Sequence, residues 1–156
     1  MTFDRVLAWL AVPVRLYLGG VFVAACLHKI ADPYAFAVDV ATYDILPLAL
    51  VNLAAIVLPW VELAAGLALL AGLRTRPAAL LVAAMLAVFL AALIVALAQG
   101  LDMSCGCFAS QGAHEDPISF RTVLRDVAWL LGAFLVLVGD RGVLGLDAVI
   151  ERRRHA

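Results

Sequence analysis

Four long apolar stretches constrain the fold of this chain more than any other feature. They cover residues 6–30, 46–71, 77–101 and 122–139. About 20 helical residues cross a hydrocarbon core of about 30 Å, so each stretch is long enough to span a bilayer. None shows the two-residue alternation of a barrel strand, which would need only about ten residues. We therefore predict an all-α integral membrane protein, a four-transmembrane-helix bundle that forms one domain over residues 1–156.

The composition supports a membrane protein and argues against a nucleic-acid partner. Apolar residues make up 66% of the chain, whereas soluble domains contain about 45–50%. The 11 basic side chains are balanced by 12 acidic ones, so the large positive field that nucleic-acid binding requires is missing. We expect membrane lipid around the bundle and no nucleic acid.

Two connecting segments carry structural signals of their own. Asp32 and Pro33 offer a carboxylate N-cap followed by proline at the first helical position, which predicts a short surface helix over 33–43. The polar loop 102–121 joins the third and fourth crossings and contains two of the three cysteines.

Basic residues predict the orientation, because loops rich in Lys and Arg stay in the cytoplasm. On the four-crossing plan one side carries most of the arginines, namely Arg5, Arg74, Arg76, Arg141 and Arg152 to Arg154. The other side carries the segment 33–43 and the loop 102–121. We therefore expect a multi-pass protein of a bacterial inner membrane, with both termini cytoplasmic and the cysteine loop in the periplasm.

The sharpest chemical feature is the tripeptide Cys105-Gly106-Cys107. A disulfide across one residue closes a very small ring, so we expect it to be strained and more easily reduced than a structural bond. This favours a redox-active disulfide. Two alternatives stay open. One is an inert turn or a static bond. The other is a metal site, in which zinc would take the two thiolates, His114 and a fourth ligand from His28 or a carboxylate, whereas a soft Cu(I) ion would need only the two sulfurs.

Cys26 lies one turn before His28 and Lys29, near the outer end of the first crossing. This is the level of the cysteine loop, and a mixed disulfide between Cys26 and Cys105 or Cys107 is therefore a hypothesis. The alternative is that Cys26 is a small packing residue.

Ionisable residues within the crossings are costly and usually face partners in the bundle. Counted inward from Arg5 and Arg74, Arg15 and Glu62 reach a similar depth, so we predict a structural ion pair between them.

A second group of ionisable residues is expected at the outer membrane face. Arg125 and Asp126 lie one turn into the fourth crossing, near the depth of His28 and Lys29. Such a cluster would stabilise a thiolate or donate a hydrogen bond to a quinone carbonyl. Snorkelling of Lys29 and Arg125 to the interface is the alternative.

Several of these motifs together resemble the MauE/DoxX group of redox-associated membrane proteins. They are RLYLGG from Arg15, HKIADP from His28, LPWVEL from Leu58, CGCF from Cys105, and Arg125-Asp126. The resemblance implies a four-helix protein that acts with periplasmic thioredoxin-like partners in thiol redox, with DoxX-type relatives linked to quinones. The family usually continues CGCF with glycine, whereas this chain has Ala109.

Taken together, residues and resemblance predict a thiol:quinone oxidoreductase-like membrane protein. Cys105 and Cys107, with Cys26 as a further candidate, would exchange electrons with a periplasmic thioredoxin-like or rhodanese-like protein. The quinone would bind near His28, Lys29, Arg125 and Asp126. The alternative is a non-enzymatic subunit or assembly factor, in a homo- or hetero-oligomer, that docks a periplasmic partner or holds a soft metal at the CGC loop.

Overall fold

The computed structural model describes residues 3–101, 105, 118–140 and 144–147, and this part of the chain is helical without any strand. Its helices are α1 (Phe3–Ala31), α2 (Pro33–Thr42), α3 (Leu48–Ala71), α4 (Thr75–Ala98) and α5 (Phe120–Gly139). All except α2 are long and apolar enough to cross a membrane. The predicted all-α class with four spans is therefore confirmed. The largest shifts in helix ends are at Phe3, predicted at residue 6, and at Ala98, predicted at residue 101.

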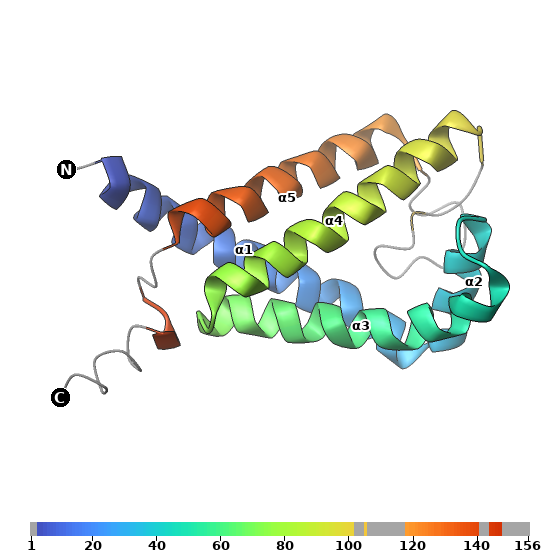
Figure 1. Ribbon diagram of the computed structural model, residues 1–156, viewed down its shortest axis with the longest axis horizontal. Helices are drawn as coiled ribbons and strands as arrows, with labels where there is room; N and C mark the ends of the chain where they lie inside the picture. The colour runs from blue at the N-terminus through green and yellow to red at the C-terminus, as the bar shows by residue number, and fades with distance from the viewer. Residues whose placement is uncertain (1–2, 102–104, 106–117, 141–143, 148–156) are drawn as a thin grey trace.

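The four long helices form a bundle in which α1 and α4 each pack between α3 and α5 (Figure 1). The start of α1, the segment 144–147 that follows α5 and the turn between α3 and α4 lie at one end of the bundle. The short helix α2 lies at the opposite end. The bundle therefore has a terminal end and an α2 end, and we use these two names below.

Helix α2 begins as its sequence predicts. The backbone N–H of Ala35 donates to Asp32 Oδ1 at 3.0 Å, and Pro33 occupies the first helical position. The helix ends at Thr42, and Asp44 reverses the chain with a φ of 50°. The five residues 43–47 connect α2 to α3.

The turn between α3 and α4 depends on Gly72, whose φ is 65°. Its N–H closes α3 onto the carbonyls of Ala68 and Leu69, and a Cβ at Gly72 would lie 2.5 Å from the Cα of Gly145. A left-handed glycine is the usual end of a helix that must reverse at once. The segment 144–147 covers this turn, and Asp147 accepts from the N–H of Thr75 at 3.4 Å.

The predicted ion pair between Arg15 and Glu62 is wrong. The guanidinium of Arg15 pairs with Asp140 at the end of α5, with 3.0 Å between Nη1 and Oδ2, and also donates to the carbonyl of Leu144 at 3.2 Å. Glu62 binds Lys29 instead, at 3.0 and 2.9 Å from Nζ to its two oxygens.

The register of α1 against α3 explains this correction. Gly19 and Gly66 face each other closely, since a Cβ on Gly19 would lie 2.9 Å from the carbonyl oxygen of Gly66. The helices are antiparallel, so Glu62 is level with residue 23 and lies about 12 Å along the axis from Arg15. Side chains also tilt toward the N-terminus of their helix, which carries Lys29 back toward Glu62 and Arg15 away from it.

Candidate functional site

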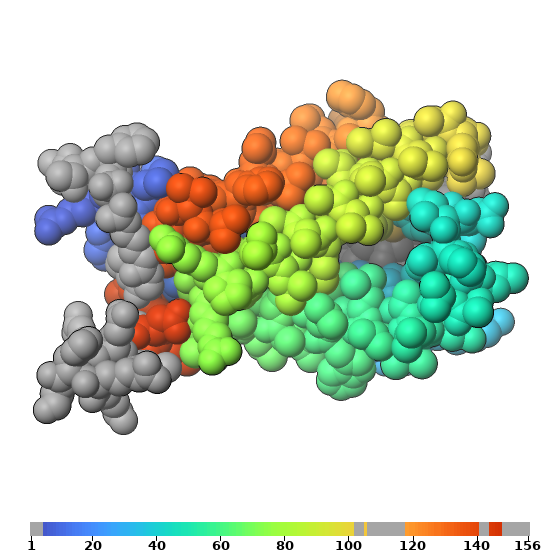
Figure 2. Space-filling view, viewed as in Figure 1, coloured from blue at the N-terminus to red at the C-terminus, as the bar shows by residue number. Residues whose placement is uncertain are grey.

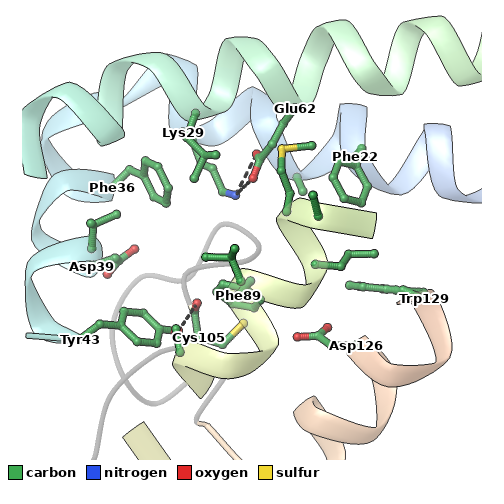
Figure 3. Close-up of a pocket in the computed structure, with 18 of the residues that line it drawn as sticks. Phe22, Lys29, Phe36, Asp39, Tyr43, Glu62, Phe89, Cys105, Asp126 and Trp129 are labelled. Atoms are coloured by element: carbon green, nitrogen blue, oxygen red, sulfur yellow. Dashed lines mark hydrogen bonds and ion pairs between the residues drawn. The ribbon is translucent and has the colours of Figure 1, made fainter. Parts of the chain in front are cut away.

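A cavity of about 480 Å³ lies at the α2 end, lined by side chains from all five helices and by Cys105. Its lining is mostly apolar, with aromatic rings from Phe22, Phe36, Phe89 and Trp129. Its polar lining residues are Lys29, Asp39, Tyr43, Glu62, Cys105 and Asp126. Figure 3 shows Lys29 with Glu62 on one side of this space and Cys105 with Asp126 on the other.

The Lys29–Glu62 ion pair forms one wall of the cavity. Both residues are buried, and the ammonium contacts both carboxylate oxygens while lying 4.8 Å from the centre of the Phe36 ring. A buried charge is tolerated only when it is paired in this way. The ammonium therefore places a strong hydrogen-bond donor against a mostly apolar cavity.

Tyr43 attaches Cys105 to α2. The Tyr43 hydroxyl donates to the backbone carbonyl of Cys105 at 2.9 Å, and its ring meets Phe89 of α4 edge-on at 6.2 Å. Cys105 also packs against the buried Leu93. These contacts fix the cysteine at the cavity wall.

The sulfur of Cys105 is fully buried and is disulfide-bonded, with its bonding partner outside the described residues. The Arg125 guanidinium approaches this sulfur, with 3.5 Å between Nη2 and Sγ. It also bonds Asp126 at 3.3 Å and lies 4.8 Å from the ring centre of Trp129. A cation held this close would stabilise a thiolate when the disulfide is opened.

Asp39 of α2 is the remaining carboxylate in the wall. Burial raises the pKa of the Asp39 carboxyl, and the positive charge of Lys29 opposes this rise. The folded protein therefore holds a proton on Asp39 more tightly than the unfolded chain does. This side chain can act as a proton donor at a higher pH than an ordinary aspartate.

The structure brings four of the predicted site residues together. Cys105, Lys29 and Asp126 line the cavity, and Arg125 contacts the sulfur of Cys105. His28 does not line it. Cys26 does not line it either: its thiol is free, fully buried, and donates to the carbonyl of Val23 at 3.1 Å.

Two further predicted residues, Cys107 and His114, lie outside the described residues.

Sequence reasoning missed the contribution of α2 and the partner of Lys29. Phe36, Asp39, Val40 and Tyr43 all line the cavity, and their spacing of three or four residues places them on one face of a helix. That spacing was a usable signal for an inward-facing surface on α2. The pairing of Lys29 with Glu62 needed the register of α1 against α3.

Comparisons with known proteins agree with the membrane fold. The sequence profile of the family described as "Methylamine utilisation protein MauE" matches residues 7–139. The methylamine utilization protein MauE of Paracoccus denitrificans is 34% identical over 127 residues, which cover 81% of this chain and 67% of that protein. No solved structure matches the chain.

Proposed function

The chain belongs to the MauE family of membrane proteins, and from this premise we propose that it is a thiol–disulfide redox protein. Cys105 and Cys107 form the redox-active disulfide. It accepts two electrons from a periplasmic thioredoxin-like or rhodanese-like protein and passes them to a membrane quinone. The relatives' name ties them to methylamine utilisation, and we infer that this chain serves the same process.

The single observation that carries this proposal is the position of Cys105, a disulfide-bonded cysteine in the wall of an apolar cavity inside a membrane bundle. At about 480 Å³ the cavity is within the range of about 300–1,000 Å³ for small-molecule sites. Its aromatic walls suit a planar ring. Lys29 Nζ offers a donor to a carbonyl oxygen on such a ring, and Asp39, whose pKa is raised by burial, can supply a proton.

The proposed reaction balances in two steps. A thiolate of the reduced partner attacks one sulfur of the disulfide, and the resulting mixed disulfide is resolved by the partner's second thiol. The partner leaves oxidised and this chain is left with two thiols. A quinone then takes up two electrons and two protons to become a quinol, and the Cys105–Cys107 bond re-forms. During this step Arg125 stabilises the thiolate of Cys105.

Single-cysteine variants test the proposal. We expect Cys105→Ser and Cys107→Ser to lower thiol-dependent quinone reduction by purified protein to the uncatalysed background, because neither can re-form the disulfide. Cys26→Ser is the matched control and should retain the wild-type rate, since Cys26 is a free thiol outside the cavity lining. Wild-type turnover in both loop variants would contradict the proposal. Stoichiometric copper or zinc on intact thiolates would favour the assembly-factor alternative.

We also propose that the α2 end faces the periplasm of a bacterial inner membrane. Arg74 and Arg76 lie beside the α3–α4 turn at the terminal end, which by the distribution of basic residues is cytoplasmic. After mild reduction, a membrane-impermeant maleimide added to the periplasmic side should label at least one of the two loop cysteines. Labelling that appears only when inverted membrane vesicles are used would reverse the orientation.

A further inference from the structure

Helices α3 and α4 pack closely only near the turn that joins them. The buried residues of the first half of α4 include Ala78, Ala79 and Val82, which form one core cluster with Ala65 and Leu69 of α3. Small side chains allow close helix approach there. Toward the α2 end the two helices diverge (Figure 1).

The cavity opens where α3 and α4 diverge. Ala84 and Val88 lie one turn apart on α4 and both line the cavity, although both are exposed, Val88 to 73%. A side chain can line a cavity and remain exposed only at an opening. Leu58 of α3 and the segment 45–46 after α2 also line it. Figure 2 shows the surface hollowed between α2, α3 and α4.

The opening is apolar, and the polar groups lie deeper. The residues named at its edge carry aliphatic side chains, and those on α3 and α4 belong to helices that are long and apolar enough to span a membrane. The Lys29–Glu62 pair, by contrast, is buried, and so are Cys105 and Asp126. A water-soluble ligand would have to enter past lipid and aliphatic side chains. A ligand with a polar ring and a long apolar tail matches both the polar groups deep in the cavity and the apolar opening.

We propose that the quinone enters this cavity sideways from the bilayer, through the gap between α3 and α4, and leaves its isoprenoid tail in that gap. This inference rests on the proposed function, to which it adds the entry route of the quinone and the position of its tail. The ring lies among Lys29, Glu62 and Cys105. The tail lies against Leu58, Ala84 and Val88 and continues into lipid.

A bulky side chain at the gap tests this route. We expect Val88→Trp to raise the KM for a long-tailed quinone about tenfold or more. The KM for a tail-less quinone should rise much less, because such a quinone leaves nothing in the gap once its ring is bound. Val138→Trp is the matched control, because Val138 of α5 is exposed to 66% and does not line the cavity. Val138→Trp should leave the KM unchanged for both the long-tailed and the tail-less quinone. Ala84→Phe, one turn away, repeats the test if Val88→Trp does not fold.

A second readout does not depend on turnover. Bound quinone is extracted from protein that was purified from membranes, and the number of quinone molecules per chain is measured. Wild type and Val138→Trp should retain long-tailed quinone that Val88→Trp has lost. Equal effects of Val88→Trp on tailed and tail-less quinones, or equal effects of the two tryptophan variants, would overturn the lateral route and leave the thiol chemistry intact. If wild type reduces neither quinone, the proposed function itself fails.

Discussion

Replacing Lys29 by methionine is expected to lower the free energy of unfolding by about 3–5 kcal/mol, because Glu62 would be left as an unpaired buried carboxylate. The two residues contact each other at 2.9 Å and are almost fully screened from solvent. Glu62→Gln should restore much of this stability in the Lys29→Met background, since the double variant removes both charges. Denaturation of the purified variants in detergent measures these differences.

The same variants separate the structural role of Lys29 from its proposed role in the cavity. The double variant should fold, yet it should reduce quinone much more slowly than wild type, because the donor against the ring is gone. A double variant with wild-type turnover would show that Lys29 serves stability alone. A Lys29→Met variant of unchanged stability would contradict the geometry of the pair.

Arg15→Leu is expected to cost a similar amount, about 3–5 kcal/mol, for the same physical reason. The side chains of Arg15 and Asp140 are 1% and 0% exposed. Arg15 also donates a hydrogen bond to the carbonyl of Leu144. The double variant Arg15→Leu/Asp140→Leu should recover most of the loss. The same denaturation experiment checks both values.

Activity distinguishes the two ion pairs. Arg15 and Asp140 line no part of the cavity, and their ion pair lies where α5 ends, since Asp140 is the residue that follows that helix. Arg15→Leu/Asp140→Leu should therefore keep the wild-type rate of quinone reduction at a temperature where it is folded. Loss of turnover in this variant, with stability recovered, would mean that the terminal end takes part in the reaction.

The sequence was sufficient for features that depend on local pattern. The four spans follow from uninterrupted apolar length, and the start of α2 follows from the capping carboxylate of Asp32 before Pro33. The convergence of Lys29, Cys105 and Asp126 on one cavity also follows from their common depth. Depth along a helix is set by a fixed rise per residue, so counting residues locates it.

Features that depend on how the helices are placed relative to one another could not be predicted from the sequence. Counting depth from Arg5 and Arg74 pairs Arg15 with Glu62, whereas α1 and α3 are aligned through Gly19 and Gly66. His28 is near the right depth but does not line the cavity, since rotation of a helix about its axis is fixed by its neighbours. The gap between α3 and α4 arises from their divergence, which no single helix encodes.

The central claim is that a quinone oxidises the Cys105–Cys107 dithiol, and an anaerobic single-turnover experiment tests it most directly. The chain has three cysteines, so fully reduced protein should titrate as three thiols. Addition of excess quinone should form one quinol per chain and leave one titratable thiol, that of Cys26. A thiol titre that stays at three, with no quinol formed, would contradict the account.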